Sequence, residues 1–216
     1  MFISYVEPNV GVITVPDERL NELAKLVNPS RVVPTTIEIV DIAGLVKGAS
    51  KGEGLGNQFL GNIRSTDAII HVVRCFDNEN VIHVDGNVNP VRDKEIIDME
   101  LQLKDLESVE KKIAKQEKAA RSGDRELKRQ LDLLEMYKQH LLKGKSARSI
   151  ALSVEEKEVV ADLFLLTNKP VLYVCNVDEA SVITGNKYVD QLKEAVKDEN
   201  AEVLLISAAI EAEIAQ

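Results

Sequence analysis

The sequence is poor in aromatic residues and cysteines and has no tryptophan. Aromatic residues make up 4% of its 216 residues, so a single-strand nucleic-acid binder would have few rings for base stacking. The two cysteines, Cys75 and Cys175, are too few for a disulfide framework, which favours a reducing, cytoplasmic location. The chain also lacks a signal-peptide pattern and any apolar run near the roughly 18 residues that span a bilayer. These absences argue against both a secreted disulfide scaffold and a membrane protein.

Basic residues are outnumbered by acidic ones, 27 to 36. The formal net charge is −9 at pH 7, and the isoelectric point is about 5.0. A surface of this charge repels phosphate backbones as a whole, so we expect no direct DNA binding. The content of 44% hydrophobic and 29% charged residues is ordinary for a globular domain. The length fits one full α/β domain with a modest insertion.

Short apolar runs alternate with amphipathic segments along the chain. Most of the apolar runs are apolar on both faces, as parallel strands are when helices cover both sides of a sheet. The pattern predicts an α/β fold, doubly wound around a mostly parallel sheet. The predicted strands are 10–15, 37–41, 68–76, 171–176 and 203–206, and the predicted helices are 17–27, 58–64, 154–166 and 188–198.

One segment, from about residue 92 to 145, is highly charged, favours helix and contains no proline. Apolar residues recur in it at helical spacing on both sides of Ser122, Gly123 and Asp124, which form a turn signature. We expect an antiparallel helical hairpin over 92–145, inserted into an α/β domain made of 1–91 and 146–216. Two interpretations stay open for it: a solvated helical decoration, or an arm that docks a macromolecular partner.

A predicted strand ends in Asp41, and Gly44 follows in the pattern Asp-x-x-Gly, ahead of a glycine-rich run. In nucleoside-triphosphate switches an Asp at this place holds Mg²⁺, usually through water. The glycine amide there approaches the terminal phosphate, because no Cβ intervenes. The pattern is weak when taken alone, since any strand followed by a turn can carry it.

The strand predicted at 171–176 ends in Asn176, and Val177 and Glu179 follow. Ligand loops lie at the carboxyl ends of parallel strands, where an Asn bridges loops or touches a purine edge. In the guanine-reading pattern Asn-Lys-x-Asp, the Lys stem packs over the base and the Asp accepts two donors. Here Val177 replaces the Lys and Glu179 replaces the Asp, so we expect guanine specificity to be lost or relaxed and adenine to be admitted. An Asn-capped turn is the alternative interpretation.

The last predicted strand runs into Ser207, Ala208 and Ala209, whose small side chains and amides can line a base pocket. Ordinary strand-to-helix turn chemistry explains them equally well in isolation. Three weak motifs in this order on successive strand ends nevertheless indicate a nucleotide site more strongly than any one of them.

Several segments together carry a resemblance to a known family. They are Glu-Pro-Asn-Val-Gly at 7–11, Arg-Val-Val-Pro-Thr-Thr at 31–36, the glycine-rich run at 41–57, Asn-Val-Ile-His-Val at 80–84, and Asn-Val-Asp-Glu at 176–179. With them the chain resembles the YchF-type ATPases, an Obg-related group of translation-factor-class P-loop proteins. The resemblance covers essentially the whole chain, and the glycine-rich run is highly specific.

The resemblance implies a protein that binds and hydrolyses ATP in preference to GTP, with Mg²⁺, and that associates with ribosomes. It also implies a helical hairpin within the nucleotide-binding domain. By the resemblance, the phosphate switch residues are Asp41, Gly44 and Leu45, with Asp41 holding Mg²⁺ through water, and the base-binding residues are Asn176, Val177, Glu179, Ser207 and Ala208. Leu45 stands where many related GTPases have a water-orienting Gln, and a hydrocarbon side chain cannot hydrogen-bond to water. Another group, or the phosphate itself, would have to orient the nucleophile.

The sequence contains no G-x-x-x-x-G-K-[ST], the loop that cradles the phosphates. In the family that loop lies upstream of the segment where Met1 falls, and a small TGS domain follows the nucleotide-binding domain. Ser4 and Tyr5 stand where the family has Cys-Thr, the second of which binds Mg²⁺. We therefore expect a truncated chain that lacks the P-loop and the TGS domain and is catalytically incompetent by itself.

Two other functions remain as alternatives. One is a non-catalytic module that binds a ribosome or a protein partner. The other is an unrelated doubly wound domain that uses Asp41 in an acidic pocket, as phosphoacceptor receivers do. It ranks last, because the further acidic residues and the late lysine that receivers need are not recognisable in the sequence.

Overall fold

The structure is a computed structural model that describes residues 9–42, 55–78, 81, 86–120 and 125–215. The chain forms two compact units, Met1–Gly44 and Leu45–Gln216, and each is described by itself. Among the described residues, no helix combines the length and apolarity that crossing a bilayer requires.

The first unit is a two-stranded ribbon with one helix. Strands β1 (Asn9–Thr14) and β2 (Thr36–Asp41) pair antiparallel, with Asn9 opposite Asp41. Between them lies helix α1 (Glu18–Val27), which begins where the Asp17 carboxylate accepts the N–H of Arg19 at 3.0 Å. It ends at Asn28, whose left-handed backbone (φ 43°) closes the last turn. A short polar residue at each end therefore defines this helix, as caps commonly do.

The expectation that the β1 and β2 runs are covered on both faces is wrong. Most side chains of the two strands are exposed, including the apolar Val10, Val12, Ile37 and Ile39. Two strands and one helix provide no layer that could cover both faces of the ribbon. The two strands themselves lie where the sequence predicts them, within one residue at each end.

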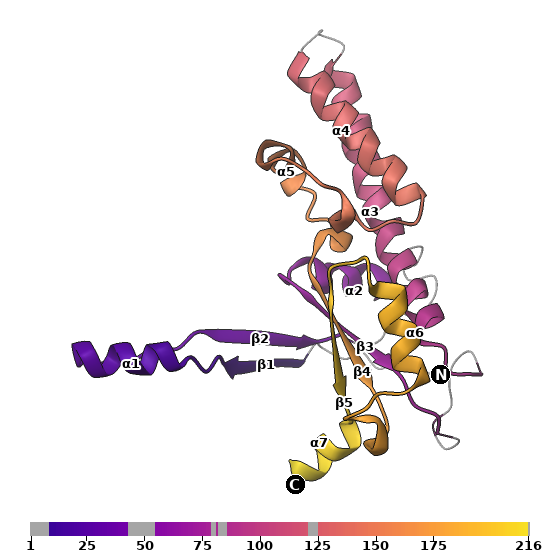
Figure 1. The fold of residues 1–216 in the computed structure, drawn as a ribbon. Coiled ribbons are helices and arrows are strands. Elements are labelled where there is room, and N and C mark those ends of the chain that lie inside the picture. The colour runs from indigo at the N-terminus through magenta and orange to yellow at the C-terminus, as the bar shows by residue number, and fades with distance from the viewer. Residues whose placement is uncertain (1–8, 43–54, 79–80, 82–85, 121–124, 216) are drawn as a thin grey trace. The chain divides into compact units, whose positions relative to one another are not determined.

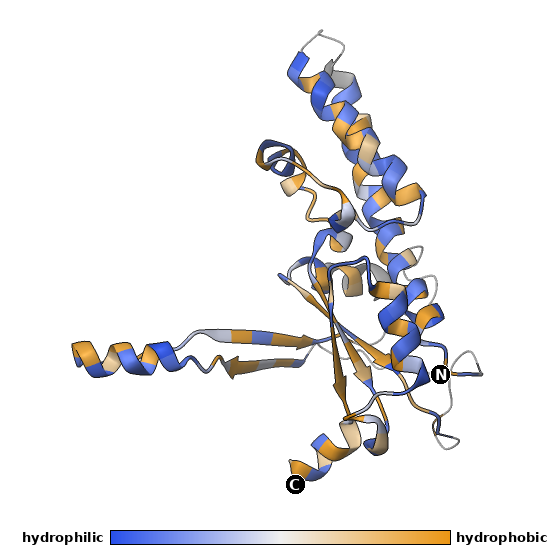
Figure 2. Cartoon of the chain, in the orientation of Figure 1, coloured by the Kyte–Doolittle hydropathy of each residue, from blue (hydrophilic) through white to orange (hydrophobic). Residues whose placement is uncertain are grey.

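The second unit contains the predicted parallel sheet. Strands β3 (Ile69–Arg74), β4 (Val171–Asn176) and β5 (Glu202–Ile206) lie in the order β3-β4-β5, and both pairs are parallel. Helix α6 (Lys187–Val196) covers one face of the sheet and completes a core that includes Tyr173, Val189 and Leu192 (Figure 1). The opposite face carries exposed apolar residues, among them Val72 at 60% exposure. The strands are accordingly the most uniformly hydrophobic part of this unit (Figure 2).

A long helical hairpin is inserted in the chain between the neighbouring strands β3 and β4. It consists of α3 (Pro90–Ala120) and α4 (Arg125–Leu142), which lie side by side in Figure 1. Gln116 donates to Gln130 at 3.2 Å, and Lys138 pairs with Glu110 at 3.3 Å, so the two helices run antiparallel as predicted. The predicted turn at 122–124 lies outside the described residues. Hydrophilic and hydrophobic residues alternate along both helices (Figure 2), as expected of helices that bury one face.

Three shorter helices complete the unit: α2 (Leu55–Arg64), α5 (Val154–Ala161) and α7 (Ala208–Ile214). Helix α5 starts with a capping box, in which Ser153 and Glu156 satisfy each other's backbone N–H groups. It ends five residues earlier than the helix predicted at 154–166. The chain leaves the helical path at Phe164, which has a left-handed backbone (φ 46°), and forms a short 3-10 helix at Leu166–Asn168.

A buried carboxylate fastens the hairpin to the return segment that leads to β4. Asp105 of α3 is 0% exposed and accepts the N–H groups of Leu166 and Thr167 and the Thr167 hydroxyl, each at 2.7 Å. The same hydroxyl oxygen accepts the N–H of Ala147 at 3.0 Å. Donors that surround a buried charge in this way offset the cost of its burial.

Glu199, just after α6, ties the hairpin to the sheet. Its carboxylate accepts the Tyr173 hydroxyl of β4 at 2.7 Å, the Arg148 guanidinium at 3.0 Å and the Lys94 ammonium of α3. Lys94 pairs also with Asp98 at 2.7 Å. Burial alone would raise the pKa of Glu199, but the hydrogen bonds from Lys94 and Tyr173 outweigh it and hold the pKa below its ordinary value.

The low pKa of Glu199 gives stability a defined pH dependence. Its contribution is fully present above the pKa of the unfolded side chain, about 4.3, and is lost as the pH falls through the lower folded value. We expect Glu199→Gln to lower the free energy of unfolding by about 2 kcal/mol at pH 7, because charged donors lose their acceptor. In urea titrations this difference from the parent should shrink towards zero as the pH falls below about 4.

Glu194→Gln is the matched control, since Glu194 is exposed and forms an ion pair with the exposed Lys197. It should change stability by less than about 0.5 kcal/mol. A Glu199→Gln deficit that stays constant from neutral to acid pH would contradict the assignment.

Candidate functional site

The carboxyl ends of the three parallel strands meet at one edge of the second unit. Arg74, Asn176 and Ile206 are the last residues of β3, β4 and β5, and the register pairs Arg74 with Asn176 and Asn176 with Ile206. Loops that follow such ends converge, which is why ligands of open α/β sheets bind there. The residues predicted to bind a base all end or follow β4 or β5 at this edge.

Asn176 joins the loops that follow all three strands. Its side-chain Oδ1 accepts the N–H of Ala208 at 3.0 Å, and its backbone carbonyl accepts the N–H of Cys75 at 2.8 Å. Oδ1 is therefore committed to the protein, while no described residue accepts a hydrogen bond from Nδ2. The side chain bridges loops, which is one of the two roles that the sequence allows for it, and its donor end is available to the second.

Val177 contributes packing at this edge. It is 3% exposed, it belongs to the core between the sheet and α6, and its N–H donates to the Ile206 carbonyl at 2.8 Å. A side chain directed into the core cannot lie over a base, so the position of Val177 favours a backbone role. Its burial also fixes where the next residues leave the sheet.

Glu179 lies exposed at the start of a short 3-10 helix, Glu179–Ser181. The preceding Asp178 caps this turn by accepting the N–H of Ser181 at 3.0 Å. Both carboxylates are exposed, but that of Asp178 accepts the cap bond, so Glu179 is the one whose carboxylate no described group bonds. An exposed carboxylate at the start of a capped turn can accept donors from a ligand.

Ser207 and Ala208 begin α7 directly after β5. Ser207 is buried, and its hydroxyl accepts the N–H of Ile210 at 3.5 Å as the N-cap of the helix. Ala208 is exposed, and its N–H is the group that Asn176 holds. The structure thus brings Asn176, Ser207 and Ala208 together. Ser207 caps α7, and Asn176 bonds to the first residue of that helix.

Two residues that support this edge were not singled out in the sequence. Asn186 donates from Nδ2 to the Cys75 carbonyl at 2.8 Å, and its Oδ1 caps α6 by accepting the N–H groups of Tyr188 and Val189. The Tyr188 hydroxyl donates to Asp77 at 2.7 Å. Gly185 followed by Asn186 ahead of an amphipathic helix is an N-cap signature, so the cap was recognisable, whereas the bond of Asn186 to Cys75, 111 residues earlier and just after β3, was not.

The predicted phosphate residues belong to the segment around the boundary of the two units. Asp41 is the last residue of β2 and is exposed, while Gly44 and Leu45 lie outside the described residues. Within the described part of the chain, no three His, Cys, Asp or Glu side chains are grouped as ligands for a metal ion. Asp41 therefore offers a single hard oxygen ligand at a strand end, which fits a Mg²⁺ ion that keeps most of its water and takes its other ligands from phosphate.

Comparison with known proteins gives the class of this chain. The sequence model of a family described as 50S ribosome-binding GTPase matches residues 8–118. A solved structure, that of the YchF GTPase of Schizosaccharomyces pombe, has a TM-score of 0.80 and 37% identity to this chain, and the match covers 98% of it and 58% of the solved chain. The chain is an α/β protein of the P-loop GTPase class, as the sequence predicts.

Relatives narrow the class further. The ribosome-binding ATPase YchF of Escherichia coli O157:H7 is 51% identical over 211 residues, and that of Bacillus subtilis strain 168 is 48% identical over 213 residues. Each match covers 98% of this chain and 58% of the relative, so the chain spans a little over half the length of these relatives. The chain belongs to the YchF family, which confirms the resemblance found in its sequence.

The bond between Asn176 and Ala208 can be tested by its contribution to stability. Asn176→Ala removes the acceptor and leaves a backbone N–H unpaired, so we expect a loss of about 1–2 kcal/mol in the free energy of unfolding by urea. Glu179→Gln, at an exposed position in the same loop, should stay within about 0.5 kcal/mol of the parent. Equal stability of the Asn176→Ala variant and the parent would show that the bridge does not hold the two loops.

Proposed function

We propose that the strand-end loops of the second unit bind the base of a purine nucleoside triphosphate, with ATP preferred over GTP. The observation that carries this proposal is the orientation of the Asn176 amide, whose Oδ1 accepts the Ala208 N–H. The Nδ2 donor is then the end that can meet a ligand. N7 is an acceptor in adenine and in guanine alike, so Asn176 would recognise a purine without choosing between the two.

The choice of base falls to Glu179 in this proposal. An ionised carboxylate only accepts hydrogen bonds. Adenine presents one amino group, at C6, whereas guanine presents two neighbouring donors, N1–H and the 2-amino group, and an Asp carboxylate suits that pair in the guanine-reading pattern. The side chain of Glu179 is longer than that of Asp by one methylene and is exposed at the start of a capped turn, so its carboxylate can extend farther from the sheet. This displacement favours the adenine amino group.

Mg²⁺ and hydrolysis belong to the same proposal. Asp41 would hold the ion through water, and Mg²⁺ when bound neutralises charge on the β- and γ-phosphates. Gly44 and Leu45 would serve as the γ-phosphate switch residue and its neighbour. Because Leu45 cannot orient water, hydrolysis by the whole protein would depend on another group. We also propose that residues 1–91 and 146–216 form the nucleotide-binding domain and that 92–145 form the hairpin insertion.

One observation favours a second candidate for the 216-residue chain. Its sequence contains no phosphate-cradling G-x-x-x-x-G-K-[ST] motif, and such loops provide much of the affinity for a triphosphate. The alternative is therefore a non-catalytic module that binds a ribosome or a protein partner.

Calorimetric titration with ATP and GTP, each with Mg²⁺, separates the two candidates. Micromolar ATP binding, with GTP weaker, supports the nucleotide site. Absence of binding by a chain with a cooperative melt overturns it for this chain and supports the interaction module.

Base selectivity gives a sharper test of the Glu179 role, in the intact protein or in any form that binds nucleotide. We expect Glu179→Asp to reduce the ratio of ATP to GTP affinity about tenfold, the size of one well-placed base contact. Glu202→Asp is the matched control, because Glu202 is exposed at the opposite, amino-terminal end of β5. An unchanged ratio in Glu179→Asp would remove Glu179 from base recognition.

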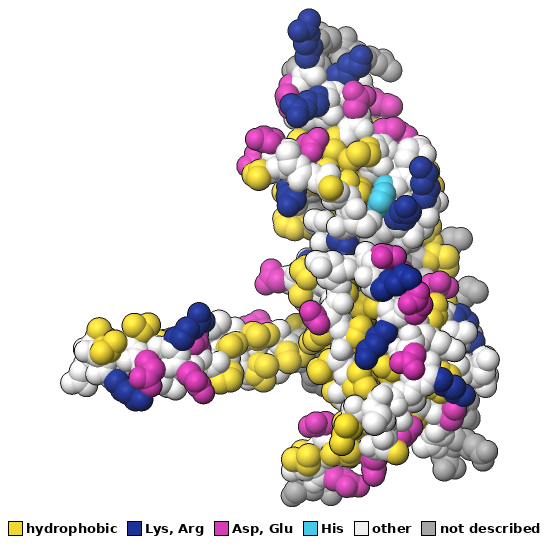
Figure 3. Space-filling model, in the orientation of Figure 1, with side chains coloured by type: hydrophobic (Ala, Val, Ile, Leu, Met, Phe, Trp, Pro, Cys, Tyr) yellow, Lys and Arg dark blue, Asp and Glu magenta, His cyan; other side chains and the backbone are white. Residues whose placement is uncertain are grey.

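Ribosome association is proposed from the names of the relatives and from the charge of the hairpin. Residues 111–129 hold eight Lys or Arg against three Asp or Glu, in a chain of net charge −9. Lys and Arg side chains gather at the free end of the hairpin (Figure 3). A segregated basic end can contact RNA phosphates although the whole protein is acidic. A ribosomal partner would place the protein in the cytoplasm.

Sedimentation with ribosomes tests this role of the hairpin. We expect Arg125→Glu combined with Lys128→Glu to reduce the fraction that co-sediments several-fold, with the largest effect at low salt. Lys187→Glu combined with Lys197→Glu, on and just beyond α6, is the charge-matched control and should leave co-sedimentation unchanged. Equal losses in both pairs would mean that overall charge, rather than the hairpin end, controls association.

A further inference from the structure

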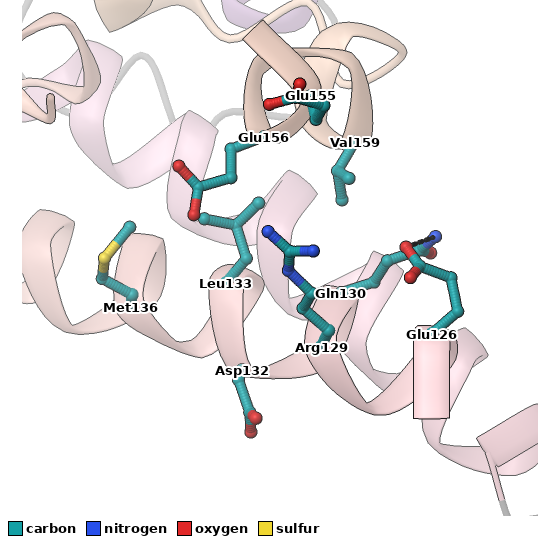
Figure 4. Close-up of a pocket in the computed structure, with 9 residues that line it drawn as sticks. All are labelled: Glu126, Arg129, Gln130, Asp132, Leu133, Met136, Glu155, Glu156 and Val159. Atoms are coloured by element: carbon teal, nitrogen blue, oxygen red, sulfur yellow. Dashed lines mark hydrogen bonds between the residues drawn. The ribbon is translucent and has the colours of Figure 1, made fainter. Parts of the chain in front are cut away.

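A pocket lies between α4 and α5, away from the strand ends. Its volume is about 280 Å³. In Figure 1, α5 and the hairpin lie beyond one end of the strands of the sheet, and α7 lies beyond the other end. The pocket is therefore separate from the loops proposed to bind a base. The lining residues are Glu126, Arg129, Gln130, Asp132, Leu133, Met136, Glu155, Glu156 and Val159 (Figure 4).

The floor of the pocket is apolar and adaptable. Leu133 of α4 points towards α5, and Val159 of α5 points back towards α4 (Figure 4). Leu133 is 8% exposed, whereas Met136, one helical turn further on, is 42% exposed. A methionine has three rotatable bonds and a polarisable sulfur, and it fits side chains of different shapes. The floor can therefore accept an apolar group from outside.

The rim of the pocket is acidic. Glu126, Glu155 and Glu156 line it together with one cation, Arg129, while the carboxylate of Asp132 points away from α5 (Figure 4). The backbone and the Ser153 hydroxyl bond to Glu155 and lower its pKa, and Arg129 contributes in the same direction, so Glu155 carries its charge at neutral pH. Glu156 is held in place by the N–H of Ser153 at 2.9 Å. The rim thus keeps a net negative charge after Arg129 is counted.

The walls of the pocket are held in place. Lys112 of α3 donates to the Val159 carbonyl at 2.6 Å and pairs with Asp162, just beyond the end of α5. Gln130 is joined to α3 by the bond from Gln116. A short helix fixed in this way presents a formed pocket, which lowers the entropy cost of binding.

We infer that this pocket binds a basic, amphipathic segment of a protein partner: one apolar side chain enters between α4 and α5, and flanking Lys or Arg residues meet the rim. Charge complementarity selects this occupant, because the carboxylates repel the phosphates of nucleic acid and attract ammonium and guanidinium groups. The aliphatic stems of Lys and Arg can also cover the exposed part of Met136. This surface goes beyond the proposed function, since nucleotide binding makes no use of it.

Methionine methyl NMR tests the inference directly. The chain contains 3 methionines, Met1, Met99 and Met136, of which Met136 lines the pocket and Met99 lies on α3 outside it. The probe is a helix-forming peptide with a single Leu between Lys and Arg residues. We expect it to shift the Met136 methyl signal in a saturable way, to leave the Met99 signal in place, and to bind more weakly as salt is added.

Variants on one helix separate the rim from general charge. We expect Glu155→Lys to weaken the peptide about tenfold, as loss and reversal of a rim charge imply. Glu158→Lys is the matched control, because Glu158 is exposed on the same helix and does not line the pocket. The Met99 signal and the melting curve of each variant report whether the fold is kept.

Several outcomes would overturn the proposal. They are no Met136 shift with the basic peptide, an equal shift with a peptide in which Glu replaces each Lys and Arg, and an equal loss of binding in Glu155→Lys and Glu158→Lys. A stronger Met136 shift with a short polyuridine than with the peptide would assign the pocket to RNA and would also overturn it. None of these outcomes bears on ATP binding, so the two proposals fail separately.

Discussion

The carboxylate of Asp105 is the interaction on which the arrangement of the second unit depends. Desolvation raises the pKa of this buried group, and the N–H and O–H donors of Leu166 and Thr167 oppose that effect by stabilising the charged form. Since Thr167 also accepts the Ala147 N–H, one side chain of α3 fixes both ends of the segment that carries α5. The entry of the chain into β4 and the position of the α4–α5 pocket both follow from this contact. Removing such a partner would leave several buried donors unpaired.

The sequence predicts the local elements of this protein better than the contacts between them. Apolar runs predict all five strands to within about two residues, because burial on a sheet leaves a continuous hydrophobic signal. Charge and turn signals likewise predict the hairpin. The role of Asp105 could not be predicted, since an Asp within a charged helix usually faces solvent and its partners are backbone groups 61 and 62 residues away. The exposed faces of β1 and β2 could not be predicted either, because apolarity does not specify which layer covers a strand.

In the candidate site, too, the sequence predicts local features better than contacts. Asn176 could be recognised as a loop-bridging residue from its place at a strand end, and the structure identifies Ala208 as its partner. Val177 and Glu179 are separated by one residue, yet one is buried in the core and the other is exposed. A motif considered as a string gives them equal weight, and in a continuing strand residues two apart would share one face. The chain instead leaves the strand after Asn176, and the turn capped by Asp178 brings Glu179 to the surface. In the proposed site, selectivity for a base would therefore depend on the turn as much as on the residue type.

The attachment of α3 has a mechanical consequence. This helix is held at Lys94 by Glu199, at Asp105 by the return segment and at Lys112 by the end of α5. At 1.5 Å per residue, these anchors span about 27 Å, and only about 12 Å of helix extends beyond the last of them. A rod clamped along most of its length has no hinge at its base. A force on the free end of the hairpin would then displace α6 and β4 rather than bend the helix. The displacement would reach the strands whose ends carry the candidate site.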